Sequence, residues 1–145
     1  IMNTASEVGY GNVIAMLPGF ESIANALLGI QIGGTPLVSM AVTVTTLAGI
    51  TGSASGGLSI ALDLMAKDWL AWANAIGMSP AVLHRVAAMA SGGMDSMPHN
   101  GVVITLLAIC GLTHKQSYPD IFALVLIKTT AAFLIIAVYM MTGLV

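Results

Sequence analysis

The sequence has very little charge. Among its 145 residues, four are Lys or Arg and six are Asp or Glu, so charged residues make up 7% of the chain while hydrophobic residues make up 57%. A soluble domain carries about 25% charged residues. So few charges cannot cover the surface of a soluble body of 14.8 kDa, and the mean hydropathy of +0.96 agrees. The composition excludes a soluble enzyme and a disordered segment, and it predicts a membrane protein.

Basic residues and cysteines are equally scarce. Four basic residues form no patch that could neutralise nucleic-acid phosphates, so a nucleic-acid partner is excluded. The single cysteine, Cys110, lies in an apolar run, so a disulfide framework or a thiolate metal site within the chain is excluded. No cofactor is expected. No basic region precedes an apolar run near Ile1, so we expect no signal peptide here and regard the chain as a piece of a longer protein.

No charged residue lies between Glu21 and Asp63, in the first half of the chain. These 41 residues would form a straight helix about 60 Å long, twice the hydrocarbon thickness of roughly 30 Å. The run must therefore fold back or break. Residues 29–36 read Gly-Ile-Gln-Ile-Gly-Gly-Thr-Pro, which predicts a turn and then a helix starting near Pro36. Residues 52–57 read Gly-Ser-Ala-Ser-Gly-Gly and offer the second break.

A loop of small residues inside hydrocarbon would leave backbone groups unpaired. Each such group costs several kcal/mol unless the loop is buried in protein or lines a wet cavity. We therefore predict that residues 36–76 form a re-entrant helical hairpin with residues 52–57 at its tip. Residues 1–35 are expected to form a preceding helical segment and connection. One long kinked span, with its glycines used for packing, is the alternative.

The second arm of this hairpin carries the charges. Asp63 and Lys67 have the spacing of a helical ion pair. Trp69 and Trp72 follow them, and tryptophans are enriched at the lipid headgroups. We expect this arm to leave the membrane at that point.

A second break follows. Residues 80–90 predict a short helix, residues 91–101 cannot continue it, and residues 102–111 resume it. Each helical arm is only about 15–18 Å long, so neither spans a membrane alone. Residues 80–112 are therefore expected to form one discontinuous transmembrane helix.

The last segment is long enough to span. Residues 119–145 predict a final transmembrane helix, with Asp120 as its N-cap after Pro119. Lys128 is interpreted as a snorkelling or bundle-facing side chain rather than a functional one. The expected fold class is an all-α polytopic membrane protein. Its orientation stays open, because the four basic residues show no clear loop asymmetry. A homo-oligomer also stays open, because the oligomeric state cannot be read from a partial chain.

Both breaks are rich in small hydroxyl residues, namely Ser53 and Ser55 in the first and Ser91 and Ser96 in the second. A broken helix near the membrane midplane exposes N–H groups and the positive end of a helix dipole. Hydroxyls and bare backbone can replace water around a carboxylate or a polyol. The pattern therefore favours a site for a small anionic ligand between the two breaks.

Ionisable residues at such depth are expensive, and a functional role is the default interpretation. Asp95 and His99 lie in the second break beside Asn100, and both can carry a proton. The structural alternatives are that Asp95 caps the start of the following helix and that His99 is a satisfied core histidine. Both interpretations stay open at this point.

The second break carries a family resemblance. Its sequence, Ser91-Gly-Gly-Met-Asp-Ser-Met-Pro-His-Asn-Gly101, is followed by Thr105-Leu-Leu and by Gly111-Leu-Thr-His-Lys115. This pattern resembles the C-terminal signature of the gluconate permease family of proton symporters. Val8-Gly-Tyr-Gly11 and residues 52–57 are similar to the same family, so the resemblance covers essentially the whole chain.

The resemblance implies a carrier built from inverted repeats. Each repeat in that superfamily has a re-entrant hairpin, a discontinuous helix and a final span, so this chain would be the C-terminal repeat, and its partner would be the missing N-terminal half. The family imports sugar acids such as gluconate, and related small hydroxy- or amino-carboxylates, with protons. Alternating access and a location in the plasma (inner) membrane of a bacterium are implied.

The resemblance also distributes roles among residues. Asp95 is the first candidate for the proton carrier and His99 the second. Glu7, beside Val8, is a further candidate proton site. Substrate contact falls on hairpin-tip and second-break residues: Ser53, Ser55, Gly56, Ser96, His99 and Asn100.

Three alternatives remain. Sodium coupling is one, because unwound carbonyls suit sodium equally well. An intramembrane hydrolase is disfavoured: the order Gly92-Gly93-Met94-Asp95 differs from Gly-x-Gly-Asp, and residues 53–56 read Ser-Ala-Ser-Gly rather than Gly-x-Ser-Gly. A structural membrane subunit is the third. An enzyme is not expected.

Overall fold

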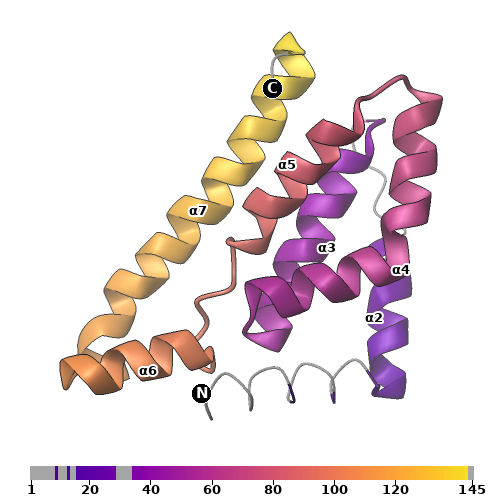
Figure 1. Cartoon of the computed structure of the whole chain (residues 1–145). Coiled ribbons are helices and arrows are strands. Elements are labelled where there is room, and N and C mark those ends of the chain that lie inside the picture. The colour runs from indigo at the N-terminus through magenta and orange to yellow at the C-terminus, as the bar shows by residue number, and fades with distance from the viewer. Residues whose placement is uncertain (1–8, 10–12, 14–15, 29–33, 144–145) are drawn as a thin grey trace.

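The computed structural model describes residues 9, 13, 16–28 and 34–143, and within these residues all regular structure is helical. The expected all-α class is therefore confirmed for the described part of the chain. The repeat architecture stays a prediction. The helices, shown in Figure 1, are α2 (Pro18–Leu28), α3 (Pro36–Thr51), α4 (Ala54–Ala75), α5 (Pro80–Ser91), α6 (Gly101–Cys110) and α7 (His114–Thr142).

Proline and glycine set the bounds of α3. Pro36 occupies the first turn, where its missing N–H costs nothing, and it follows an extended Thr35. The helix ends at Gly52, whose φ of 65° is the left-handed conformation that glycine adopts without strain. Ser53 then starts α4, because its Oγ accepts a hydrogen bond from the Gly56 N–H at 3.2 Å. The chain thus reverses direction within two residues.

The helices α3 and α4 form a hairpin whose arms pack closely near the turn. A methyl group built on Gly57 would collide with the backbone of Ala48, so only glycine allows this approach. Figure 1 shows that α4 bends along its length, so that its second part turns away from the direction of its first. Whether this hairpin enters a membrane and leaves on the same side stays a prediction.

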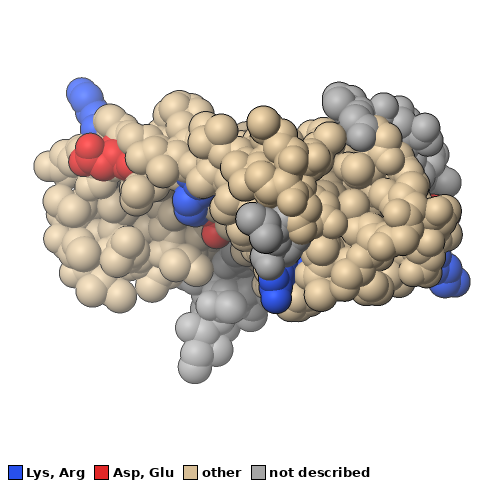
Figure 2. Space-filling view, turned by 90° about the horizontal axis from the view of Figure 1, so that it is seen from above, with Lys and Arg blue, Asp and Glu red and all other residues tan. Residues whose placement is uncertain are grey.

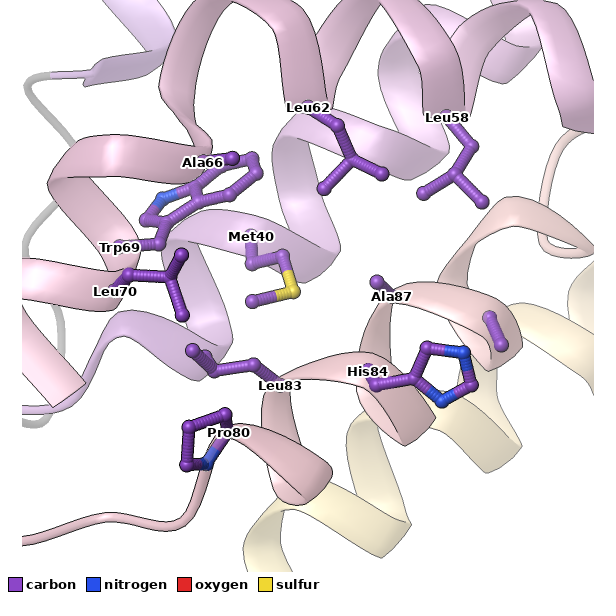
Figure 3. A pocket seen from close by; sticks show the side chains of 11 residues that line it. Met40, Leu58, Leu62, Ala66, Trp69, Leu70, Pro80, Leu83, His84 and Ala87 are labelled. Atoms are coloured by element: carbon purple, nitrogen blue, oxygen red, sulfur yellow. The ribbon is translucent and has the colours of Figure 1, made fainter.

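Helix α3 is the centre of the core. It packs against α4, α5 and α7, and twelve of its 16 residues are buried. Trp69 of α4 is 3% exposed within this core, and its indole N–H donates to the Ser39 Oγ at 3.4 Å. Figure 3 shows the Trp69 ring beside Met40 of α3, and the expected position of Trp69 at the lipid headgroups stays a prediction. The core is completed by Leu37, Met40, Val44, Leu47, Ala61, Met65, Val82, Val86 and Ile136.

The second break separates α5 from α6. Ser79 caps α5 through a hydrogen bond from the Ala81 N–H, and α5 ends at Ser91. Residues 92–100 form turns and bends, after which α6 begins at Gly101. Figure 1 shows α6 lying across the direction of α5 rather than continuing it. The expectation that the two helices together cross a membrane once stays a prediction.

The last helix starts five residues earlier than its expected position. Its N-cap is Thr113, and the Gln116 Oε1 accepts hydrogen bonds from the Thr113 N–H at 2.9 Å and from its hydroxyl at 2.8 Å. The expected cap at Asp120 is wrong, because this local cap begins the helix and Pro119 is accommodated inside it.

Among the described residues, α7 is the helix long and apolar enough to cross a membrane. Its 29 residues measure about 43 Å. The most apolar 18-residue window has a mean hydropathy of 2.5 and is only 17% buried, unlike the core helix of a soluble protein. The face in Figure 2 shows few charged groups, and most of it is uncharged. These features indicate a membrane protein.

Candidate functional site

The two predicted breaks meet in the structure through Asn100. Its Nδ2 donates to the Gly52 carbonyl at the hairpin tip, at 2.6 Å, and to the Asp95 carbonyl within the second break, at 2.7 Å. Asn100 is 6% exposed, so these bonds are made away from water. One side chain therefore fixes the position of the hairpin tip against the second break.

The same side chain begins α6. The Asn100 Oδ1 accepts a hydrogen bond from the Val103 N–H at 2.9 Å, which is the usual N-cap contact. Asp95 therefore does not cap this helix, and that structural alternative is wrong. Asn100 satisfies backbone groups of the tip, the break and the helix at once, which explains why an amide, with both donors and an acceptor, stands there.

The hairpin tip is held by hydroxyl groups. The Thr51 Oγ1 donates to the Leu47 carbonyl at 2.8 Å and lies 3.2 Å from the Ser53 carbonyl. The Ser53 and Ser55 hydroxyls are 3.4 Å apart. Ser53 is buried, whereas Ser55 is exposed, so of the two the Ser55 hydroxyl is open to a ligand from outside the tip. Gly56 is half-buried beside them.

His99 lies on the hairpin tip. A methyl group built on Gly52 would stand 2.6 Å from the His99 Cδ2 and 2.9 Å from its Nε2. The imidazole therefore sits against Gly52, where any side chain would collide with it. His99 is exposed, so it is not part of the hydrophobic core of the described residues.

Asp95, Ser96 and Lys128 form a closed triangle of hydrogen bonds. The Lys128 Nζ lies 2.7 Å from the Asp95 Oδ1 and donates to the Ser96 Oγ at 3.1 Å. The Ser96 hydroxyl in turn donates to the Asp95 Oδ1 at 3.0 Å. Within the described part of the chain this is the one salt bridge; Asp63 and Lys67 of α4, despite their spacing, form none.

Lys128 was not among the residues that the sequence pattern selected. It is the fifteenth of the 29 residues of α7, so its Cα lies near the middle of the helix that is long enough to span. The side chains of Lys128 and Asp95 are 40% and 24% exposed. A charge at that depth is expensive and needs a partner. The signal in the sequence was one lysine within a long apolar segment. The sequence did not indicate that Asp95, 33 residues earlier, would be its partner.

The second break is packed between α3 and α7 by small residues. A methyl group built on Gly93 would lie 3.0 Å from the Thr45 Cγ2 and 3.1 Å from the Thr129 Oγ1. Thr45 itself donates to the Ala90 carbonyl at 3.0 Å, at the end of α5. The Thr129 hydroxyl is buried without a hydrogen-bond partner among the described residues. This hydroxyl faces Gly93 of the second break and has almost no surface open to solvent.

A separate cavity lies between α3, α4 and α5, with a volume of about 210 Å³ (Figure 3). Its lining is almost wholly apolar, and the Trp69 indole N–H is already bonded to Ser39. Such a lining does not suit an anionic ligand. His84 lies on α5 at its edge, far along that helix from the break. The candidate site is therefore the junction of the two breaks and not this cavity.

The structure thus places most of the predicted site residues together. Asn100 contacts the tip and the backbone of Asp95, Asp95 contacts Ser96, and His99 lies on Gly52. Glu7 lies outside the described residues. No group of three or more His, Cys, Asp or Glu side chains suited to a metal ion occurs in the part of the chain that the structure describes.

Comparison with known proteins gives one relative. The chain is 59% identical, over 144 residues, to a protein of Bacillus subtilis (strain 168) named uncharacterized transporter YxjC. The match covers 99% of this chain and 30% of that protein, so the chain spans about a third of its relative's length. No family model matches the chain. No solved structure matches it.

Proposed function

We propose that the chain is part of a secondary active transporter that imports gluconate, or a related small hydroxycarboxylate, together with protons. The transport class is supported by the similarity to a protein named as a transporter. The substrate class and the coupling ion are supported by the resemblance of residues 91–101 to gluconate permeases and by the chemistry of the site. Neither the similarity to a named transporter nor the resemblance of residues 91–101 supports an enzymatic role.

The observation that carries the proposal is the junction of the two helix breaks. Asn100 joins the hairpin tip to the second break, and an ion pair between Asp95 and Lys128 lies beside the middle of α7. Irregular backbone and ionisable side chains at the depth of a membrane-spanning helix occur where a substrate or ion passes. A purely structural subunit has no need of either.

In the proposed mechanism the substrate binds between the breaks. Its hydroxyls bond to Ser55, Ser96 and exposed backbone groups, and Asp95 or His99 takes up the coupling proton. The loaded protein then changes between states open to opposite sides, and release of the substrate on the low-proton side follows loss of the proton. The tip and the break must move as one unit during this change, because Asn100 ties them together.

The test uses the complete protein in liposomes, with uptake of radiolabelled gluconate as the measurement. An inward proton gradient is expected to drive accumulation, and an ionophore that collapses the gradient is expected to abolish it. Accumulation driven by a sodium gradient at equal pH would replace proton coupling by sodium coupling. No uptake of gluconate, or of a panel of hydroxycarboxylates, under either gradient would contradict the proposal.

Asp95→Asn tests the coupling group within this assay. The amide cannot carry a proton, so we expect the variant to lose proton-driven accumulation while keeping exchange of labelled for unlabelled substrate across the membrane. His99→Gln is the comparison for the second candidate. Normal accumulation by Asp95→Asn would show that Asp95 is not the coupling group.

A further inference from the structure

Lys128 is the one cation bonded to the second break, and its surroundings are those of a binding residue. Two of its three N–H donors are used, one by the Asp95 Oδ1 and one by the Ser96 Oγ. Next to it, the buried Thr129 hydroxyl has no hydrogen-bond partner among the described residues. The side chain is 40% exposed, so a small ligand can reach the ammonium group.

We propose that Lys128 is the residue that binds the substrate carboxylate, and that it exchanges Asp95 for the substrate when Asp95 takes up a proton. This inference rests on the proposed function, since it assumes a carboxylate substrate and proton coupling. In the empty site the ammonium group is neutralised by Asp95. In the loaded site the substrate carboxylate takes the place of Asp95, with Ser96 as a further donor.

The charges balance in this exchange. The empty site holds one carboxylate and one ammonium group and is neutral. One bound anion and one proton on Asp95 leave a carboxylic acid, an ammonium group and a substrate carboxylate, which again sum to zero. Binding the anion without the proton would leave an uncompensated charge beside α7, which is costly at the depth of a spanning helix. One proton is therefore taken up for each monoanion.

No other charged group competes for Asp95 among the described residues. The helix α3, which packs against the break at Gly49 and Gly93, has no titratable side chain. The helix α6 has only the exposed Cys110, at its far end. His99 faces Gly52. The remaining titratable groups of α4, α5 and α7 are bonded neither to Asp95 nor to Lys128: Asp63, Lys67, Asp68, His84, Arg85, His114, Lys115, Tyr118, Asp120 and Tyr139.

The test measures gluconate binding to the complete purified protein in detergent, together with proton uptake. Proton uptake is obtained from the binding heat in buffers that differ in their ionisation enthalpy. We expect the wild type to take up one proton per gluconate. Lys128→Met is expected to weaken binding about 10- to 100-fold, the usual effect of losing a hydrogen bond to a charged group.

The variant Asp95→Asn separates carboxylate binding by Lys128 from proton uptake by Asp95. Its Lys128 is already free of a carboxylate, so we expect it to bind gluconate at least as tightly as the wild type does, with no proton uptake and with little dependence on pH. Lys128→Arg keeps the charge and is expected to bind more tightly than Lys128→Met. Lys67→Met, which removes an exposed lysine of α4, is the matched control and is expected to behave as wild type.

Folding is checked for each variant by gel filtration and thermal unfolding. The double variant Asp95→Asn with Lys128→Met leaves no unpaired charge, so it keeps the test open if Lys128→Met alone fails to fold. It is expected to bind as weakly as Lys128→Met. Wild-type affinity in folded Lys128→Met, or proton uptake on binding by Asp95→Asn, would overturn this inference alone. No binding or uptake of any hydroxycarboxylate by the wild type would overturn the proposed function, and this inference with it.

Discussion

At the scale of single residues, Asn100 connects more parts of the site than any other described side chain. It caps α6, and it donates to carbonyl groups of the hairpin tip and of its own break. Without Asn100, the Gly52 carbonyl and the Val103 N–H would lose a buried partner without gaining water. The residue was predicted from its place in a polar motif, as a substrate contact. Its structural contacts were not predicted, since they depend on a residue 48 positions earlier.

Asn100→Ala is expected to lower the free energy of unfolding of the complete protein by about 2–4 kcal/mol, because it removes a helix cap and leaves one buried and one partly buried carbonyl group without their partner. Ser79→Ala is the matched control. It removes the cap of α5 alone, at an exposed position, and is expected to cost about 1 kcal/mol. Chemical denaturation in detergent measures both. Equal losses in the two variants would mean that the bonds from Asn100 to the tip and the break add nothing.

At the scale of elements, the glycines of the hairpin have different structural roles. Gly52 ends α3 in the left-handed conformation, and Gly57 lets α4 cross the backbone of Ala48. The sequence placed the reversal of the chain in this run of small residues. It did not distinguish a glycine needed for its φ from one needed for its lack of a Cβ, because that difference depends on what packs against each.

Gly57→Ala is expected to separate the arms of the hairpin and to lower the free energy of unfolding by about 2 kcal/mol or more, although alanine favours the helix itself. Gly56→Ala, one residue earlier, meets first only the Ser53 side chain, at 3.2 Å, and is the matched control for stability. The thermal unfolding midpoints of the two variants are compared in the complete protein. A Gly57→Ala variant as stable as Gly56→Ala would contradict the close approach of the arms.

At the scale of the whole molecule, α7 combines an apolar exposed surface with a lysine at its middle. An exposed apolar helix of this length is stable in lipid, where its side chains need no protein partner. Lys128 turns instead toward the break, which lies against α7 through Gly93 and Asp95. This helix therefore has an exposed apolar face and a face that contacts the second break.

Cysteine labelling tests this placement of α7. In a Cys110→Ser background, Leu126→Cys puts a thiol on the exposed face near the middle of α7. We expect it to resist a charged maleimide in vesicles permeabilised so that the reagent reaches both sides of the membrane, because the reactive thiolate does not form in hydrocarbon. Lys115→Cys, in the first turn of the same helix, is the control and is expected to react. Equal labelling of the two positions would contradict a membrane span.

The sequence by itself determined the class of the protein and the positions of its breaks. Scarce charge and high hydropathy are properties of composition, and helix starts at Pro36 and Pro80 follow from local backbone chemistry, so neither needs a partner from elsewhere in the chain. The start of the last helix was predicted wrongly, because Pro119 was taken as its beginning although Thr113 caps the helix earlier in the chain. The tertiary structure alone decided which residues meet. The bonds of Asn100 to Gly52 and of Asp95 to Lys128 join residues 48 and 33 positions apart, and such contacts depend on how helices pack rather than on any periodic pattern.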